Sequence, residues 1–287
     1  DARLATANPA GGVLAITAGT ITLDGTTAAS RFVVAGFEDT ALSATNALRV
    51  AGAGSHDFRG DLRLSAGRIT AATGADVTVA ATGTLTTAAP GAAPTTTASD
   101  FGARVVLEGG RVVHGGRIQL AGGEVTLRAT GADTLDGDGA FVRSIELLAG
   151  SRLEATGFTK TFDTVTVSAP AGIVRLAAAL GGVRTHADSV VDVSASGADA
   201  GQFVVSAVAG SVQFDGTLRG AATGTATIAP RNGRFALDAL SLADLSTLAA
   251  RLQAGGFTDA VSVRVREGDL SLLADATLRA NRVSLSA

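Results

Sequence analysis

Three histidines, His56, His114 and His186, have the side-chain type that suits general-base chemistry or metal binding near neutral pH. They lie far apart in the sequence, so no two of them have the short spacing of a local metal-binding motif. The chain also has nothing like the Gly-x-Ser-x-Gly motif that places a serine nucleophile at a strand-to-helix turn. We therefore expect these histidines to be surface or corner residues without a catalytic role.

Three aspartates, Asp133, Asp136 and Asp138, crowd into the segment GADTLDGDGAF. A glycosidase needs two carboxyl groups across a sugar bond, and polysaccharide lyases and glycosidases also use parallel β-helices. Such enzymes usually line a cleft with aromatic and basic residues, whereas this chain has no Trp and no Tyr on which a sugar could stack. We interpret the segment as a polar turn between Leu135 and Phe141, and a polysaccharide-active enzyme stays open as the alternative.

The same segment does not match a calcium loop. An EF-hand loop needs a glutamate at its last position, but here Ile145 stands at that position and Glu146 follows one residue later. The chain has no cysteine, which excludes a thiolate metal site. We therefore predict no catalytic, cofactor-binding or metal-binding residue and no cofactor, and the ligand-binding residues stay unknown.

A recurring phrase indicates the elements in which these residues lie. A short strand, a tight step at Ala-Gly and a second short strand recur at least five times. Strand-like alternation dominates the chain, and the spacing between strands leaves no room for crossover helices. This pattern favours an all-β solenoid, whose stacked coils build long parallel sheets. The copies are AITAGTITLDG (15–25), RLSAGRITAATG (63–74), QLAGGEVTLRATG (119–131), LLAGSRLEATG (147–157) and SAVAGSVQFDG (206–216).

Composition agrees with a folded, exported protein. Hydrophobic residues make up 46% of the 287 residues and charged residues 17%, so a buried core is expected. The net charge of −3 and the interspersed charges argue against a nucleic-acid partner. Nearly all cations are arginines, and Lys160 is the only lysine. The absence of cysteine favours export, and no apolar run is long enough to span a membrane.

Two segments depart from the solenoid pattern. The segment 86–100 is rich in Thr, Ala and Pro and is expected to form an extruded loop. Leucines recur at helical spacing within 238–258, which predicts a helical excursion with Ser241 as its N-cap and Gly255 just beyond its end. We expect the leucine stripe to pack on the outer face of a nearby sheet. The stripe comprises Leu242, Leu245, Leu248 and Leu252.

The Ala-Gly strand pairs, together with the stretch from Pro230 to Ala287, resemble filamentous-haemagglutinin-like exoproteins of bacterial two-partner secretion. The resemblance implies a right-handed parallel β-helix, export through an outer-membrane pore, and a role as an adhesin or a long surface filament. The asparagine-rich signature of the family's N-terminal secretion domain is missing, and Asn8-Pro9 does not supply it. We therefore expect an internal segment, 1–287, of a larger protein, in which a region outside this chain addresses the pore.

These observations lead to one functional hypothesis. We expect a segment of a secreted adhesin on the cell surface of a Gram-negative bacterium, acting as a non-catalytic rigid stalk or adhesive surface and not as an enzyme. Its receptor, whether host, bacterial or surface-bound, stays unknown. The two ends, Asp1 to Leu4 and Val283 to Ala287, show no capping helix or charged plug, so we also expect head-to-tail self-association.

Overall fold

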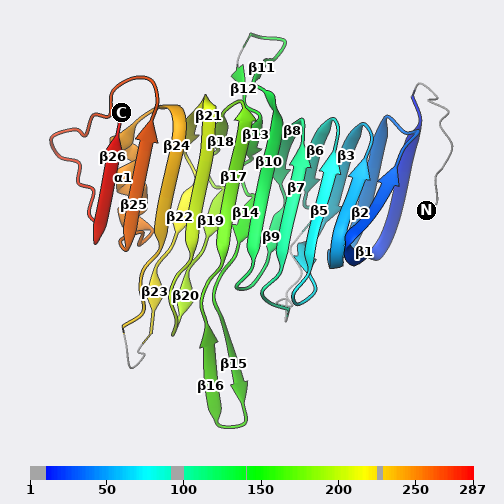
Figure 1. Cartoon of the computed structure of the whole chain (residues 1–287), viewed down its shortest axis with the longest axis horizontal. Coiled ribbons are helices and arrows are strands. Elements are labelled where there is room, and N and C mark those ends of the chain that lie inside the picture. Colours follow the sequence, from blue (N-terminus) through cyan, green and yellow to red (C-terminus); the bar gives the residue numbers. More distant parts are fainter. Residues whose placement is uncertain (1–10, 92–99, 140, 225–228) are drawn as a thin grey trace.

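The computed structural model describes residues 11–91, 100–139, 141–224 and 229–287. These residues are nearly all β, with mostly parallel strands and a single α-helix, which confirms the predicted all-β class. The strands lie side by side across an elongated body, with β1 and β26 at its opposite ends (Figure 1). Most strands pair in parallel with the equivalent strand of the next coil, so the body is a solenoid.

Three parallel ladders, named here faces A, B and C, run along the body. The long strands β1 (Val13–Val34) and β2 (Asp39–Phe58) bend through all three faces, whereas later coils use separate short strands. The other strands of face A are β3 (Asp61–Ala66), β6 (Thr84–Ala88), β8 (Arg111–Gly115), β13 (Ile145–Leu147), β18 (Val183–Thr185) and the later parts of β21 (Gln202–Phe214) and β24 (Arg234–Leu242).

Faces B and C complete each coil. Face B continues through β4 (Ile69–Ala71), β9 (Arg117–Gln119), β14 (Arg152–Glu154), β19 (Val190–Asp192) and β22 (Thr217–Arg219). Face C continues through β5 (Asp76–Ala81), β7 (Arg104–Gly109), β10 (Glu124–Ala132), β17 (Ile173–Leu180), the first parts of β21 and β24, β25 (Ala260–Val265) and β26 (Arg282–Ser286).

The core is one continuous apolar cluster inside the coils. Alternate residues of each strand point inward, and the parallel register places like residues above one another. On face C, a column of fully buried aliphatic side chains crosses successive coils, and each side chain is covered by its neighbours above and below. This column comprises Val79, Leu107, Leu127, Leu176, Val205, Leu237 and Val263.

Glycines allow the coils to approach at the corner before face C. Gly123 and Gly172 lie in successive coils, and the amide of Ile173 donates to the carbonyl of Gly123 at 2.9 Å. A Cβ atom on Gly172 would lie 1.7 Å from that carbonyl oxygen, far inside contact distance. Only glycine fits there without separating the two coils.

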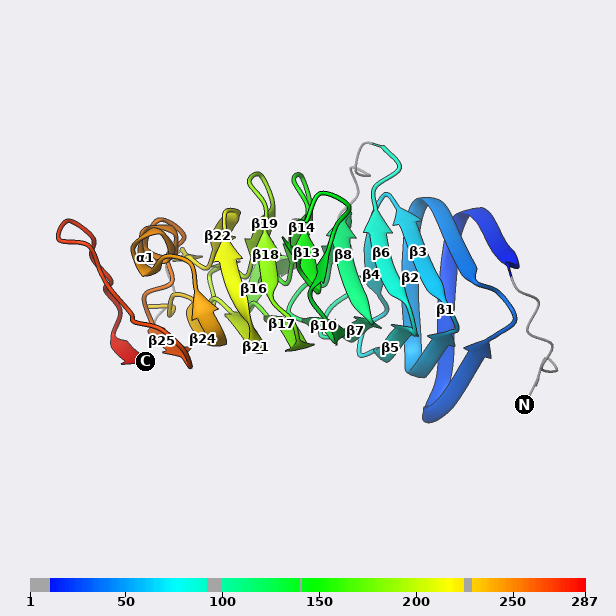
Figure 2. The ribbon, with the colours of Figure 1, turned by 90° about the horizontal axis from the view of Figure 1, so that it is seen from above.

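The helix α1 (Leu245–Ala254) corrects two details of the prediction. Ser241 belongs to β24, and the N-cap is Asp244, whose carboxylate accepts from the amide of Ser246 at 2.8 Å. The helix contacts β22 and lies in line with β22, β19 and β14 (Figure 2), so it takes the place of a face B strand. The leucine stripe therefore packs into the core and not on an outer face. Its leucines replace the inward-pointing side chains that a face B strand supplies in other coils. The core residues here are Leu245, Leu248, Leu252 and Phe257.

The predicted loop 86–100 is wrong at its first residues. β6 extends to Ala88 and pairs with β3 and β8, so the first residues of the predicted loop belong to face A. The segment 92–99 lies outside the described residues. After this segment, Phe101 forms a parallel bridge with Ala121.

The structure also contains excursions that the sequence analysis did not predict. Two antiparallel hairpins leave the coils, one formed by β11 (Thr134–Leu135) and β12 (Phe141–Val142), the other by β15 (Phe158–Phe162) and β16 (Val165–Ala169). The short strands β20 (Ala195–Ser196) and β23 (Ala222–Thr223) form a parallel pair beside the second hairpin (Figure 1).

Candidate interaction surface

The hairpin β15–β16 leaves the body at the corner between face B and face C. It connects β14 to β17 and projects away from the coils (Figure 1). Its two strands are joined by a two-residue turn, Asp163 and Thr164, with Asp163 in the left-handed region at φ 52°. Aspartate adopts this conformation more readily than most residues, so the turn suits the sequence.

One face of this hairpin, named here the hairpin face, is apolar and uncovered. The register pairs Lys160 with Val167 and Phe162 with Val165 across the strands. Phe162, Val165 and Val167 are 55%, 61% and 52% exposed, which is unusual for three adjacent large apolar residues. Apolar residues exposed singly are common, but a contiguous exposed apolar patch points to a contact with another molecule.

The opposite face of the hairpin carries only hydroxyl side chains. Thr159 lies opposite Ser168, and Thr161 lies opposite Thr166. Their hydroxyl oxygens are 3.3 Å and 3.0 Å apart within the two pairs. The hairpin is therefore two-faced, and its hydroxyl face suits water while its apolar face does not.

Lys160 provides a cation within the hairpin face. Its ammonium nitrogen lies 5.0 Å from the centroid of the Phe162 ring, within the range of a cation–π contact. In the part of the chain that the structure describes, no carboxylate lies within ion-pair distance of Lys160, whereas Arg117 and Arg234 are paired with Glu154 and Asp259. The hairpin face therefore combines apolar surface with an uncompensated positive charge.

The root of this hairpin is fixed to the body by aromatic packing. Phe158 stacks on Phe101, with ring centroids 5.4 Å apart and planes 11° from parallel. A shallow groove runs from this root toward the end of α1 and is lined by small and hydroxyl-bearing residues and one arginine. Its lining consists of Thr156, Gly157, Ser194, Ala195, Ser196, Arg219, Ala221, Thr223, Ala254 and Gly255.

The hairpin β11–β12 leaves the opposite edge of the body, between face C and face A (Figure 1). Leu135 and Phe141 form its cross-strand pair and are 61% and 66% exposed. Asp136 and Asp138 are exposed beside them, and the amide of Asp138 donates to the Asp136 carboxylate at 3.0 Å. These two aspartates therefore lie in an exposed turn between Leu135 and Phe141, as predicted.

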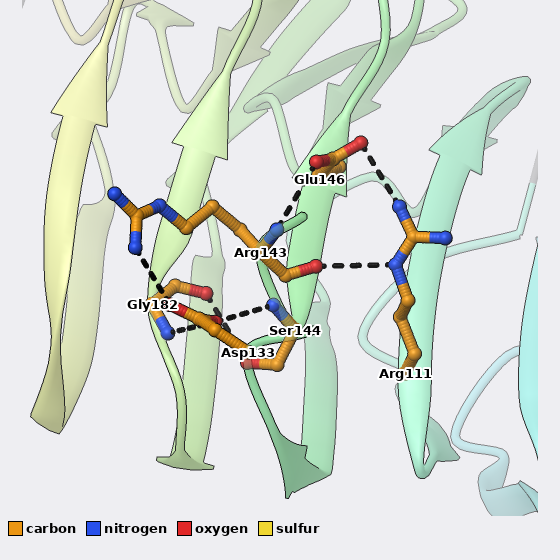
Figure 3. A network of polar contacts seen from close by, with 6 residues as sticks. All are labelled: Arg111, Asp133, Arg143, Ser144, Glu146 and Gly182. Carbon is orange, nitrogen blue, oxygen red and sulfur yellow. Dashed lines mark hydrogen bonds and ion pairs between the residues drawn. The ribbon is translucent and has the colours of Figure 1, made fainter. Parts of the chain in front are cut away.

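Asp133, the third aspartate of that segment, holds the root of β11–β12 (Figure 3). Its carboxylate accepts from the amides of Ser144 and Gly182, at 2.9 Å and 2.7 Å, and from the guanidinium of Arg143 at 2.7 Å. Glu146, which lies on β13, accepts from the backbone amide of Arg143 at 3.2 Å. These contacts already occupy both oxygens of Asp133, so its evident role is to attach the hairpin to the coils.

Two of the three histidines are buried, so the prediction of surface or corner positions is wrong for them. His114 points into the core of face A, where its Nε2 donates to the carbonyl of Arg152 at 3.1 Å and its Nδ1 accepts from the Thr87 hydroxyl at 2.6 Å. Burial lowers the pKa of His114 to about 4. These two hydrogen bonds use both ring nitrogens of a neutral imidazole, so the ring can be buried without an unpaired polar atom.

His56 is the second buried histidine. It takes an inward position of face C between Phe32 and Val79, and its ring lies 5.9 Å from that of Phe32. Burial lowers its pKa, against the nearby Asp57 and Asp24 carboxylates, which raise it. In contrast, His186 is half-buried at a corner, as predicted, with its Nε2 3.9 Å from the carboxylate of Glu146.

Among the described residues, no group of three or more His, Cys, Asp and Glu side chains could hold a metal ion. No helix in the described ranges is long and apolar enough to cross a membrane. No protein-family model, curated protein or solved structure matches this chain. Its function therefore has to be argued from its own fold and surfaces.

The hairpin face is the functional candidate that sequence reasoning missed. By its alternation alone, the run Val165 to Val167 suits a strand of the solenoid equally well. A signal was nevertheless present, since the alternating runs 158–162 and 165–169 are separated by only two residues, a spacing typical of a β-hairpin.

Proposed function

We propose that this chain is an internal segment of a secreted cell-surface adhesin, in which the coils form a rigid stalk and the hairpin β15–β16 an adhesive surface. The single observation that carries this proposal is the two-faced hairpin, which projects its uncovered apolar face and Lys160 from a continuous parallel solenoid. Exposed apolar patches of this kind are rare on proteins that have no partner.

The stalk role is supported by the ladders. Backbone hydrogen bonds of the parallel ladders join successive coils, and core columns such as that of face C continue across coils. Bending the body would break many of these contacts together, so it suits a spacer. We further propose that the coils wind right-handed, because connections between parallel strands of one sheet are almost always right-handed.

The resemblance of the Ala-Gly strand pairs to two-partner secretion exoproteins supplies the proposed context. On this proposal, the protein leaves a Gram-negative cell through an outer-membrane pore that is addressed by a region outside this chain. The coils require no disulfide, since the chain has no cysteine. The receptor is a partner with an apolar surface that accepts the hairpin face.

An adhesion assay tests the proposal. Beads coated with the chain are applied to epithelial and bacterial cell layers, and bound beads are counted. We expect the double variant Phe162→Ser, Val165→Ser to lose adhesion severalfold. The matched control is Leu180→Ser, which removes a residue that is 60% exposed on the body. Equal adhesion of both variants, or no adhesion of the unmodified chain, would contradict the proposal.

A second assay addresses catalysis. The chain is incubated with acidic and neutral polysaccharides, and the release of unsaturated or reducing ends is followed. The proposal predicts no release. Turnover that Asp136→Asn or Asp138→Asn abolishes would replace the adhesin with a polysaccharide-active enzyme.

A further inference from the structure

One coil carries both hairpins. After β10 on face C the chain forms β11–β12, then β13 and β14, and then β15–β16 before it returns to face C as β17. The strands β10 and β17 are direct neighbours. The two hairpins therefore leave the body at nearly the same level along its axis, and they point in opposite directions (Figure 1).

The two hairpins have complementary surfaces. Leu135 and Phe141 of β11–β12 are exposed beside the carboxylates of Asp136 and Asp138. The guanidinium of Arg143 also lies 5.3 Å from the centroid of the Phe141 ring, but it is paired with Asp133. The hairpin face of β15–β16 is also apolar, but its charge is the ammonium group of Lys160, which is unpaired among the described residues. Contact between them would cover apolar surface on both sides and bring opposite charges together.

We infer that copies of this chain associate side by side, with the hairpin β15–β16 of one copy against the hairpin β11–β12 of the next. A lateral shift of one copy, with the solenoid axes kept parallel, is enough to bring the two hairpins together. The contact is heterologous, because different surfaces meet, so a pair of copies keeps one unused hairpin of each kind, one on each copy. The unused hairpin face is then the one that can meet the receptor. Repetition of the contact builds a row of parallel solenoids.

Both hairpins are held in place before they meet. The carboxylate of Asp133 ties the root of β11–β12 to Ser144 and Gly182, and the stacked rings of Phe101 and Phe158 hold the root of β15–β16. Fixed elements lose less conformational entropy on association than mobile loops do. This favours a contact that uses only two small hairpins per copy.

Charge reversal gives the first test. Sedimentation of the purified chain over a range of concentrations should show reversible association, weakened severalfold by Lys160→Glu and by Asp138→Lys. The double variant that carries both changes restores opposite charges and should recover association. Association that persists unchanged in both single variants would mean that copies meet elsewhere, for example end to end, and would overturn the inference. A strictly monomeric chain would overturn it as well.

Cross-linking gives the second test and locates the contact. Because the chain has no cysteine, a Leu135→Cys variant mixed with a Phe162→Cys variant can form only the designed disulfide and the two self-pairs. Under mild oxidation we expect the mixed dimer to form severalfold faster than in a mixture of Val208→Cys and Phe162→Cys. Val208 is exposed near the edge that carries β11–β12 but lies outside both hairpins. Equal rates in the two mixtures would overturn the inference, and neither outcome depends on adhesion to cells.

Discussion

Two segments with nearly the same amino-acid sequence differ completely in solvent exposure. Val125-Thr-Leu127 lies in β10, between β7 and β17, and both of its large apolar side chains are fully buried. Val165-Thr-Val167 lies in β16, which pairs only with β15, and both of its valines are exposed. Alternation therefore specifies a strand, but it does not specify what covers the strand's apolar side. That side is buried only where neighbouring coils pair with the strand and pack against it.

The largest loss of stability should come from truncating a side chain of the buried segment, Val125 to Leu127. Leu127→Ala removes a side chain between Leu107 and Leu176 and should lower the free energy of unfolding by about 2–5 kcal/mol. Val167→Ala should change it by less than about 0.5 kcal/mol, because the side chain is already exposed to water. Chemical denaturation of the two variants checks both values. A similar loss in both would show that the hairpin face is covered by the chain itself.

A second prediction concerns the buried ring of His114. Its pKa is about 4 in the folded protein and near 6.5 when unfolded, so only the unfolded chain takes up this proton between those values. The free energy of unfolding should therefore fall by about 1.4 kcal/mol per pH unit below pH 6.5, and by about 3 kcal/mol in total at pH 4. Above pH 6.5 both states are neutral at this ring and the contribution is complete.

The control for this pH effect is the double variant Thr87→Val, His114→Leu, which removes both partners of the buried hydrogen bond. Its free energy of unfolding should fall less steeply between pH 6.5 and 4, because the variant lacks the His114 ring. The carboxylates are the same in both proteins, so their titration does not contribute to the difference. Parallel pH profiles of the variant and the unmodified chain would show that His114 does not carry the effect.

A third prediction concerns the corner that sets the distance between coils. Gly172→Ala should lower the free energy of unfolding by about 1–3 kcal/mol, because the added Cβ meets the carbonyl oxygen of Gly123. Gly91→Ala is the matched control, since a Cβ there has nothing within 4 Å. Thermal denaturation distinguishes the two. Equal midpoints would mean that the coils can separate at this corner without loss.

The general architecture could be predicted from the sequence because it rests on local patterns. Short alternating runs separated by glycine leave few options other than stacked coils, and the leucine spacing of α1 identified the helix. The side on which that helix packs was not predictable, since its stripe would suit an outer face equally well. The helix lies where face B ends, next to β22. That end is known only once all the strand pairings of the coils are known.

The candidate site was harder to predict for a similar reason. The solvent exposure of Phe162 results from the departure of the hairpin from the coil, not from the identity of the residue. The burial of His114 depends on two partners far away in the sequence, Thr87 and the carbonyl of Arg152, which the register of face A brings together. The burial of His114 therefore leaves no local signal. The two-residue gap between 158–162 and 165–169 indicates a hairpin, but it does not indicate that the apolar side of this hairpin stays uncovered.

The smallest effect should come from the hydroxyl face of the hairpin. Thr161 and Thr166 face each other across the strands with their oxygens 3.0 Å apart, in contact with water. Replacing both with serine keeps the hydroxyl groups but removes two methyl groups and lowers β-propensity, so the hairpin should lose about 0.2–1 kcal/mol of local stability. The global unfolding midpoint should not move, because the hairpin can open while the coils stay paired. Hydrogen exchange resolved to single amides measures this directly: faster exchange confined to 158–169 is expected, whereas faster exchange in β14 and β17 would show that the hairpin supports the solenoid as well as projecting from it.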